Sequence, residues 1–435
     1  MFSELKSKIE SKLANIGIIG QGYVGLPLAV EFAKAGFSVT GFDTDDKKVS
    51  SINKGVSYIL DVSSVDVKEL VASGKLKATA DTRLLGKMDV IIICVPTPLR
   101  KTKEPDISYI LAASDAIADN IRRGQLVILE STTYPGTTEE IILPKLINGG
   151  FKIGKDIFLA FSPERVDPGN PKYKTKDITK IVGGVTPECT ELARLLYFQA
   201  IKEVIPVSST RSAEMVKLLE NTFRSVNIAM VNELALMCHK MGLDVWEIIN
   251  AAKTKPFGFM PFYPGPGIGG HCIPLDPLYL SWKARQHGFE ARFIELAAEI
   301  NSSMPHYVVD KITSILNEKK KPLKGSNILV IGITYKKDIN DVRESPGLEI
   351  VDSLIKKDAH VHCHDPLVSG FELDGCKKIT TVKLTKDVIS SSDLVVIITD
   401  HTDINYKFIV DNAKLIFDTR NALKDFKNAK NIIKL

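Results

Sequence analysis

Asn15-Ile-Gly-Ile-Ile-Gly-Gln-Gly-Tyr-Val-Gly25 is a short apolar run that leads into a GxGxxG motif. The run predicts a buried strand, residues 26–36 have helical apolar spacing, and residues 38–43 predict a second strand. Asp43 ends that strand about twenty residues after the motif. Glycines at these positions allow a tight turn, admit a pyrophosphate to the backbone and let the helix pack closely. The predicted cofactor-binding residues of this unit are Gly20, Gly22, Tyr23, Val24, Gly25 and Asp43.

The carboxylate of Asp43 would accept hydrogen bonds from a ribose and repel a 2′-phosphate, which favours NAD over NADP. Asp43 could instead serve only to form a turn, and a GxGxxG motif without its flanking strands would be weak evidence. With both strands and the acid present, we expect dinucleotide binding.

Further apolar runs extend this pattern along the chain. Residues 89–96 and 125–130 add strands to the first sheet, and we place its domain at residues 1–205. A comparable order returns near the C-terminus, with strands predicted at 327–332, 360–365, 393–398 and 414–420 and a helix at 347–357. The second sheet lacks the glycine set of the first and is assigned to residues 321–435.

The region between the two sheets is assigned to residues 206–320, and residues 208 to about 317 contain no strand-like run. Apolar positions within residues 210–239 are spaced for one long helix. The predicted fold class is therefore α/β, with two Rossmann-like parallel-sheet domains joined by a long central helix and a helical connector. We expect the long helix to join the domains and to form a homodimer.

Composition excludes several classes of protein. The 435 residues are 44% hydrophobic and 25% charged, as in ordinary globular chains, and allow about three domains. A net charge of +5 is too small to indicate nucleic acid, and the apolar runs are too short to cross a membrane. Six scattered cysteines without a CxxC pair indicate reduced thiols and no metal site. Residues 1–13 lack the apolar stretch of a secretory signal, so we expect a cytoplasmic protein.

Phe262-Tyr-Pro-Gly-Pro-Gly-Ile-Gly-Gly-His-Cys-Ile-Pro-Leu-Asp-Pro277 is the densest segment of the chain in glycine and proline. Such a stretch cannot continue a helix or a central strand, and it suits a backbone that wraps round a ligand. Cys272 lies inside it, next to His271 and four residues before Asp276. Most cysteines are small buried hydrophobes, but a thiolate in this loop could add to an aldehyde. His271 could act as a base or point away.

Other polar residues remain ambiguous from spacing alone. Lys217 and Asn221 lie four residues apart and share a helix face, either in solvent or toward a site. After the first strand of the second sheet, Lys336 and Arg343 offer cations suited to a phosphorylated or uridine-bearing ligand. A solvated charged loop is the alternative.

Taken together, these motifs resemble the UDP-sugar 6-dehydrogenase family, which includes UDP-glucose, UDP-N-acetylglucosamine and UDP-N-acetylmannosamine dehydrogenases. The resemblance covers nearly the whole chain. It rests on Gly20 to Gly25, Cys94-Val-Pro-Thr-Pro98, Glu130-Ser-Thr132, Ser162-Pro-Glu164, Lys217 with Asn221, Gly269-Gly-His-Cys272 with Asp276, and Thr334-Tyr-Lys-Lys-Asp338 with Arg343.

The resemblance implies oxidation of a sugar C6 alcohol to a carboxylate, with two NAD reduced per substrate. By resemblance Cys272 holds the C6 aldehyde as a thiohemiacetal and then a thioester. Lys217 stabilises oxyanion charge, Asp276 and Thr132 position a water, and Glu164 takes part in proton transfer. Asn221 completes the implied catalytic set, Pro96, Thr97 and Thr132 join the NAD site, and the implied substrate-binding residues are Glu164, Arg165, Lys217, Asn221, Tyr263, Gly267, Gly269, Lys336, Arg343 and Arg420.

Departures from the family pattern bear on the substrate. UDP-glucose enzymes usually have a Lys directly before the aspartate that matches Asp276, where this chain has Leu275, and an arginine upstream of the loop that is absent from residues 255–260. These departures favour a UDP-N-acetylhexosamine, with UDP-N-acetylglucosamine first, UDP-N-acetylmannosamine close behind and UDP-glucose as an alternative. More distant alternatives are a two-electron hydroxyacid or sugar-phosphate dehydrogenase and a non-catalytic NAD-binding sensor.

Overall fold

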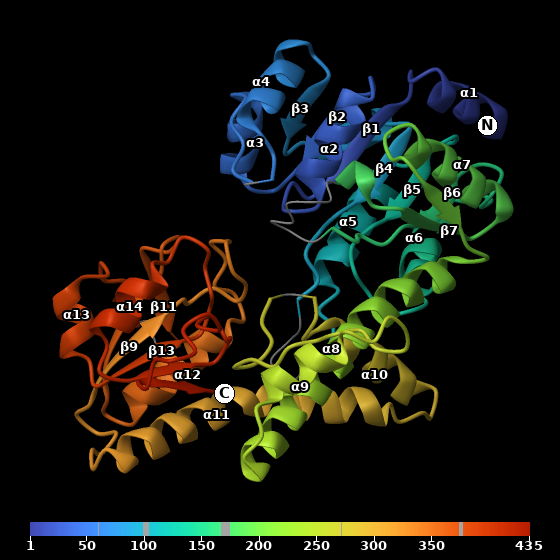
Figure 1. The fold of residues 1–435 in the computed structure, drawn as a ribbon. Coiled ribbons are helices and arrows are strands. Elements are labelled where there is room, and N and C mark those ends of the chain that lie inside the picture. Colours follow the sequence, from blue (N-terminus) through green and yellow to red (C-terminus); the bar gives the residue numbers. More distant parts are fainter. Residues whose placement is uncertain (60, 99–103, 167–174, 271, 374–376) are drawn as a thin grey trace. The chain divides into compact units, whose positions relative to one another are not determined.

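The computed structural model describes residues 1–435 apart from residues 60, 99–103, 167–174, 271 and 374–376. Two units are distinguished and are described separately. The first comprises Met1–Glu220 and Trp282–Gly288, and the second comprises Asn221–Ser281 and Phe289–Leu435. Figure 1 shows the first unit mainly in blue to green and the sheet of the second in orange to red. The three-part division into residues 1–205, 206–320 and 321–435 stays a prediction.

An eight-stranded sheet forms the centre of the first unit, in the order β3-β2-β1-β4-β5-β6-β7-β8. Neighbouring strands are parallel except for the antiparallel pair β6 and β7. The strands are β1 (Asn15–Ile19), β2 (Ser38–Phe42), β3 (Leu76–Thr79), β4 (Val90–Ile93), β5 (Leu126–Leu129), β6 (Phe158–Phe161), β7 (Lys180–Gly184) and β8 (Val204–Pro206). The four strands predicted from the apolar runs are confirmed as β1, β2, β4 and β5.

Helices cover both faces of this sheet. Along β4, Val90 and Ile92 pack into one buried cluster with residues of α2 and α7, while Ile91 and Ile93 pack into another with residues of α5. A strand buried on both faces explains the unbroken apolar run in the sequence. The helices are α1 (Phe2–Glu10), α2 (Gly25–Lys34), α3 (Asp46–Asn53), α4 (Ser64–Ala72), η1 (Thr82–Lys87), α5 (Ser108–Ala118), η2 (Thr138–Ile142), α6 (Leu143–Ile147), η3 (Thr175–Asp177) and α7 (Pro187–Phe198).

The second unit contains a five-stranded parallel sheet in the order β10-β9-β13-β14-β15, and a separate antiparallel pair of β11 and β12. The four strands predicted here are confirmed as β9 (Asn327–Ile331), β10 (His360–His364), β13 (Leu394–Ile397) and β14 (Ile416–Asp418). The remaining elements are β11 (Gly370–Leu373), β12 (Lys377–Thr380), β15 (Ile432–Lys434), α12 (Pro346–Lys356), α13 (Lys386–Ser391) and α14 (Tyr406–Asn412).

Alternate residues of the central strand β9 again face two clusters. Ile328 and Val330 pack with residues of α12, and Leu329 and Ile331 pack with residues of α13 and α14. Both sheets are thus covered on two faces, and the predicted α/β class with two parallel-sheet domains is confirmed.

Four helices occupy the region between the sheets: α8 (Thr210–Met241), α9 (Val245–Ala252), α10 (Asp276–Gln286) and α11 (Arg292–Glu318). The long helix predicted at residues 210–239 is confirmed as α8, which passes from the first unit into the second after Glu220. Gly242, with a φ of 71°, follows the last residue of α8, and Asp244 caps the N-terminus of α9 by accepting hydrogen bonds from two backbone N–H groups.

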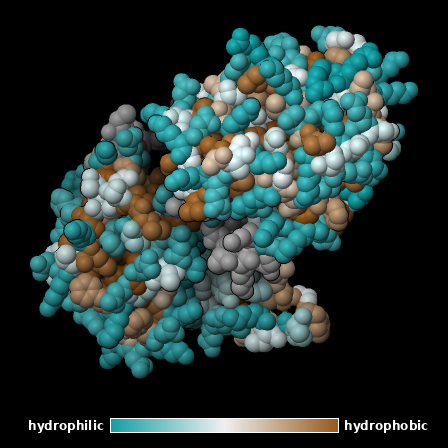
Figure 2. Space-filling view, turned by 90° about the horizontal axis from the view of Figure 1, so that it is seen from above, coloured by the Kyte–Doolittle hydropathy of each residue, from teal (hydrophilic) through white to brown (hydrophobic). Residues whose placement is uncertain are grey.

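The described residues contain no membrane-spanning helix and no disulfide. None of their helices is both long enough and apolar enough to cross a membrane. The five described cysteines form no disulfide, and Cys272 is the exposed one. Hydrophilic residues cover most of the face shown in Figure 2, with hydrophobic patches between them.

Candidate functional site

The turn between β1 and α2 has the geometry expected for a dinucleotide phosphate. A Cβ on Gly25 would lie 1.8 Å from the carbonyl oxygen of Gly20, so only glycine lets the helix start this close to the strand. No atom of the described residues lies within 4 Å of a Cβ built on Gly22, which leaves room for an approaching phosphate. Val24 is the N-cap of α2, so the helix begins with its free N–H groups at this turn. These residues fit NAD, which would bind here and accept hydride.

Asp43 lies directly after β2, where a ribose-binding acid is needed. Its carboxylate accepts hydrogen bonds from the backbone N–H of Gln21 at 2.8 Å and of Asp45 at 2.9 Å, and Lys48 is 3.3 Å away. The bond to Asp45 is the turn-forming contact that the sequence left as an alternative, and the bond to Gln21 ties the acid to the glycine turn. A carboxylate has about four acceptor positions, so this arrangement still leaves one for a ribose hydroxyl.

Four predicted segments meet at one edge of the first sheet. Strands β1, β4, β5 and β6 are parallel neighbours, so their carboxyl ends share that edge. The glycine turn follows β1, Pro96 and Thr97 follow β4, Thr132 follows β5 and Glu164 follows β6. Open parallel sheets bind ligands beyond such an edge, and these predicted residues therefore stand where the fold places a site.

Glu164 is held in a buried cluster that the sequence did not reveal. Lys180, the first residue of β7, lies 3.5 Å from Glu164 and forms a second ion pair with Glu130. Glu130 also accepts a hydrogen bond from the Tyr197 hydroxyl at 2.9 Å and lies 3.5 Å from the sulfur of Cys94. One buried lysine is therefore shared by two carboxyl groups.

The two carboxylates differ in their pKa because they differ in surroundings. Burial acts to raise the pKa of Glu164, but the charges of Lys180 and Lys217 and the backbone N–H of Val166 outweigh it, so the pKa is lowered. Burial dominates at Glu130 and raises its pKa despite Lys180. The pKa shifts of the two carboxyls therefore have opposite directions, downward at Glu164 and upward at Glu130.

Lys217 is buried, so the solvated alternative for this residue is wrong. Its side chain is 7% exposed, and its charge helps to lower the pKa of Glu164. Arg165 donates two hydrogen bonds to Glu220, at 2.6 and 3.2 Å, and a third to the Thr179 carbonyl. The first unit therefore brings Glu164 and Lys217 together, whereas Arg165 is engaged by another acid.

The loop after β5, which carries Thr132, is anchored by a buried glutamate. Glu214 on α8 accepts hydrogen bonds from the backbone N–H groups of Gly136 and Thr138 and from the Thr138 hydroxyl, at 2.5–2.9 Å. Burial raises the pKa of Glu214 to about 7 against these bonds. Glu214 stands one helical turn before Lys217, so the same helix orients the loop and carries the lysine.

In the second unit, the structure brings together three predicted catalytic residues. Cys272 is exposed, and its carbonyl accepts a hydrogen bond from the backbone N–H of Asp276 at 2.8 Å. Asp276 begins α10 and is buried, and its carboxylate accepts a 2.5 Å hydrogen bond from the side-chain amide of Asn221. Cys272 is thus joined through its backbone to the residue whose carboxylate Asn221 holds. His271 lies outside the described residues.

The glycine-rich loop packs against the sheet domain of the second unit. A Cβ on Gly265 would lie 2.5 Å from the guanidinium of Arg420, so the loop backbone covers this arginine directly. Gly267 lies beside Pro305 and Pro346, and Gly269 lies beside Tyr335. Arg420 also donates to the Ile398 carbonyl at 2.9 Å. The glycine-rich loop and Arg420, a predicted substrate-binding residue, are therefore packed together.

A buried chain of amides holds the start of that loop. The backbone N–H of Gly265 donates to Asn232 on α8 at 3.0 Å, and Asn232 donates to Asn301 on α11 at 3.0 Å. Asn301 in turn donates to the Ser225 carbonyl at 3.1 Å. Every link is a buried hydrogen bond, which fixes the loop against two helices.

Lys336, Arg343 and Tyr263 are the remaining predicted substrate-binding residues. Lys336 is half-buried in the loop after β9. Arg343 is exposed and forms an ion pair with Asp341 at 2.7 Å. Tyr263 stacks on Trp246 with its ring centroid 5.9 Å away. Among the described residues, no cluster of three or more His, Cys, Asp or Glu side chains could hold a metal ion.

Lys180, Asn232 and Asn301 were missed by the sequence analysis, as was His401, which is described below. Lys180 directly precedes the apolar stretch Ile181–Gly184, and the sequence alone predicts that a lysine at the start of a strand lies in solvent. The two asparagines interrupt apolar helix faces, a signal that could have marked them as buried and hydrogen-bonded.

Comparison with known proteins covers all three regions of the chain. Models of the UDP-glucose/GDP-mannose dehydrogenase family match residues 14–201 as the NAD binding domain, 211–303 as the central domain and 329–425 as the UDP binding domain. The predicted cofactor, NAD, is thereby confirmed.

Individual relatives agree with this assignment. The UDP-N-acetyl-D-glucosamine 6-dehydrogenase of Pseudomonas aeruginosa is 38% identical over 82% of this chain and 83% of its own. The UDP-N-acetyl-D-mannosamine dehydrogenase of Pyrococcus horikoshii is 37% identical over 94% of this chain and 96% of its own. A solved structure of the UDP-D-ManNAc dehydrogenase from Pyrococcus horikoshii superposes with a TM-score of 0.88 and 35% identity, covering 97% of this chain and 98% of that one. The chain belongs to the UDP-glucose/GDP-mannose dehydrogenase family and is an NAD-dependent oxidoreductase.

Proposed function

We propose that this protein oxidises the C6 alcohol of a UDP-N-acetylhexosamine to a carboxylate, transferring four electrons to two NAD molecules in turn. The observation that carries the proposal is the exposed Cys272, whose backbone carbonyl is hydrogen-bonded to Asp276 of the buried pair of Asp276 and Asn221. The glycine-rich loop around this thiol packs on Arg420 of the sheet domain, whose family model is a UDP binding domain.

In the first step, the C6 alcohol loses a hydride to NAD and its hydroxyl proton to a base, which leaves an aldehyde. The thiolate of Cys272 then adds to the aldehyde carbon and forms a thiohemiacetal. Loss of a second hydride to a second NAD, with release of the hydroxyl proton, gives a thioester. Lys217 supplies a fixed buried cation for the oxyanion charge that develops in these steps.

Hydrolysis of the thioester completes the reaction. Water adds to the thioester carbon, the bond to the Cys272 sulfur breaks, and the acid and the thiol are released. Asp276 and Thr132 are the proposed residues that position this water. Glu164 is the proposed acceptor of its proton, and the charges of Lys180 and Lys217 lower the pKa of this carboxyl in spite of burial, which favours its ionised form.

The favoured substrate is UDP-N-acetylglucosamine, with UDP-N-acetylmannosamine second. Support comes from the Leu275-Asp276 pair that stands where UDP-glucose enzymes have Lys-Asp, and from relatives named for both N-acetylated sugars. NADH release should be measured with UDP-glucose and with the gluco, manno and galacto forms of UDP-N-acetylhexosamine. Preferred turnover of UDP-glucose would overturn the substrate and leave the mechanism standing.

A two-electron dehydrogenase, in which Cys272 is only structural, predicts one NADH and an aldehyde or ketone product. The proposed reaction predicts two NADH for each acid formed. Cys272→Ser should abolish acid formation, while Cys238→Ala, a change at a buried cysteine of α8, should retain it. Acid production at the wild-type rate by the serine variant would remove Cys272 as the nucleophile. Binding of both UDP-sugar and NAD without any NADH formation would refute the proposed reaction.

We also propose a homodimer formed through α8, in the cytoplasm. Six large apolar side chains are exposed along this helix at steps of four and seven residues, which places them along one side: Met215, Leu219, Phe223, Met230, Met237 and Met241. Phe223→Glu should convert the dimer to a monomer in light scattering. A monomeric wild type at micromolar concentration would contradict the dimer.

A further inference from the structure

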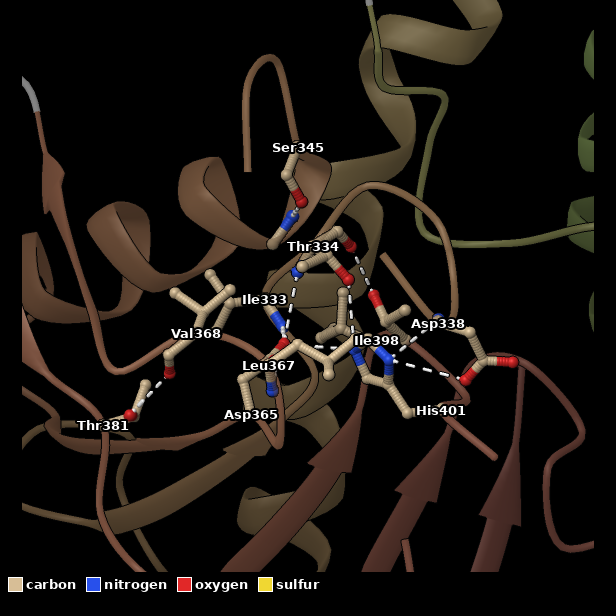
Figure 3. A network of polar contacts seen from close by, with 12 residues as sticks. Ile333, Thr334, Asp338, Ser345, Asp365, Leu367, Val368, Thr381, Ile398 and His401 are labelled. Carbon is tan, nitrogen blue, oxygen red and sulfur yellow. Dashed lines mark hydrogen bonds and ion pairs between the residues drawn. The ribbon is translucent and has the colours of Figure 1, made fainter. Parts of the chain in front are cut away.

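The loop after β9, residues 334–338, contains Lys336, one of the residues that the family resemblance implies for substrate binding. In Figure 3, the imidazole of His401 lies between Asp365 and Thr334 on one side and Asp338 on the other. His401 follows β13 and is completely buried. A buried histidine in contact with both ends of a binding loop needs a physical explanation.

The hydrogen bonds assign the proton of this histidine. The backbone N–H of Asp338 points at Nδ1 of His401, 3.0 Å away, so Nδ1 accepts and carries no proton. The proton is then on Nε2, which lies 3.1 Å from the carboxylate of Asp365 and 3.0 Å from the hydroxyl of Thr334. Asp365 thereby selects the tautomer whose other nitrogen can hold the loop.

The loop closes on itself around this contact. The hydroxyl of Thr334 donates to the carbonyl of Lys336 at 2.8 Å. Asp338 has a positive φ of 61°, and its carboxylate accepts two hydrogen bonds from Thr402, at 2.6 and 2.8 Å. A residue other than glycine adopts such a backbone angle only where its surroundings impose it. The His401 and Thr402 pair imposes it here.

Asp365 ties the imidazole to the sheet. Its carboxylate also accepts hydrogen bonds from the backbone N–H groups of Ile333 at 2.8 Å and Leu367 at 2.9 Å. The acid that orients His401 is therefore itself fixed at the ends of β9 and β10.

We propose that His401 is a positioning residue for the sugar nucleotide: oriented by Asp365, its Nδ1 holds the 334–338 loop in the conformation that receives the diphosphate. This inference rests on the proposed function, because it takes the nucleotide to bind at this loop. His401 does not contact the reacting atoms, and it acts through the backbone of Asp338 and the placement of Lys336.

Two isosteric variants separate this role from general packing. The oxygen of Asn takes the place of His Nδ1, so His401→Asn keeps the acceptor for the Asp338 N–H. The amide nitrogen of Gln takes the place of Nε2, so His401→Gln keeps the donor to Asp365 and loses the acceptor. His362→Gln, on the exposed side of β10, is the matched control.

The measurements are the Kd of UDP by calorimetry, the KM and kcat for the UDP-sugar, and the Kd of NADH. A buried N–H without an acceptor costs enough to weaken UDP binding about 5- to 100-fold in His401→Gln. KM should rise more than kcat falls, and the Kd of NADH should stay within about twofold. His401→Asn should bind UDP within about threefold of the wild type, and His362→Gln should equal it.

Three results would overturn the inference: equal loss of UDP affinity in the Asn and Gln variants, a Gln variant that binds UDP as the wild type does, or a parallel loss of NADH affinity. Hydrogen exchange over residues 334–340 tests the loop without any ligand, and only His401→Gln should accelerate it. If the wild type binds no UDP, the proposed function is refuted. If hydrogen exchange over residues 334–340 is nevertheless faster only in His401→Gln, the role of His401 in shaping the loop is retained.

Discussion

Replacing Lys180 by methionine would leave two buried carboxyl groups without their shared cation. Glu130 is completely buried, and Glu164 is 13% exposed at its side chain. Removing one partner of a buried ion pair costs about 3–5 kcal/mol of unfolding free energy. A buried carboxyl can limit this cost by taking up a proton.

The free-energy cost of protonating a buried carboxyl determines how the loss of stability depends on pH. Holding a carboxyl protonated costs about 1.4 kcal/mol for each pH unit above its ordinary pKa near 4.3, or about 3.7 kcal/mol at pH 7 and about 1 kcal/mol at pH 5. Without Lys180 the folded-state pKa of the completely buried Glu130 stays above its unfolded value, because burial is no longer opposed by that cation, whereas Glu164 keeps Lys217 and its backbone hydrogen bonds. The native state then binds more protons than the unfolded state, so stability is lost as the pH rises. We expect Lys180→Met to lose about 3–4 kcal/mol at pH 7 and about 1 kcal/mol at pH 5.

Calorimetric unfolding at both pH values checks this expectation. The relevant transition is the one that NADH shifts upward, because ligand binding stabilises the unit that binds it. A unit of this size loses about 2–4 °C of Tm per kcal/mol, which corresponds to about 6–16 °C at pH 7 and about 2–4 °C at pH 5. The double variant Lys180→Met/Glu130→Gln should recover more than half of the loss at pH 7. An equal Tm drop at both pH values, or additive losses in the double variant, would refute the reasoning.

The remaining predictions concern single contacts. Gly25→Ala places a Cβ 1.8 Å from the Gly20 carbonyl and should weaken NADH binding at least about tenfold in a fluorescence titration, with UDP binding unchanged. Glu214, whose pKa is about 7 in the folded protein, contributes stability that is present below pH 4.5 and is lost as the pH rises through 7. Glu214→Gln should therefore flatten the dependence of Tm on pH between 5 and 8, and an unchanged slope would contradict the assignment. Gly265→Ala pushes a Cβ within 2.5 Å of Arg420 and should raise the KM for the UDP-sugar several-fold, while an unchanged KM would separate this arginine from the substrate.

The fold was predictable where strands are buried on both faces. Val90–Ile93 and Leu394–Ile397 are unbroken apolar runs because helices cover both sides of each parallel sheet. Strand β7, which lies between β6 and the edge strand β8, was not predictable in the same way. It begins with a lysine and ends in two glycines, and its antiparallel pairing with β6 depends on neighbours rather than on its own composition.

The site was predictable where its residues are close in sequence. Lys217 and Asn221 lie one helical turn apart on α8, and Cys272 precedes Asp276 by the same interval. Spacing of this kind is visible in any sequence. Glu164 and Lys180 are separated by 16 residues, and Thr334 and His401 by 67, so neither contact has a local signal.

Strand register supplies the missing signal for these distant contacts. Ile93 pairs with Leu129, so the next residues, Cys94 and Glu130, lie side by side, and their side chains are 3.5 Å apart. In the second sheet, Ile331 pairs with Ile397, which places the segments that contain Thr334 and His401 next to each other. Parallel neighbours are joined through a crossover of a dozen or more residues, which hides such pairs from sequence spacing. Aligning the carboxyl ends of predicted parallel strands, rather than scanning for local motifs, would therefore have drawn attention to Glu130 beside Cys94 and to His401 beside the loop that contains Thr334.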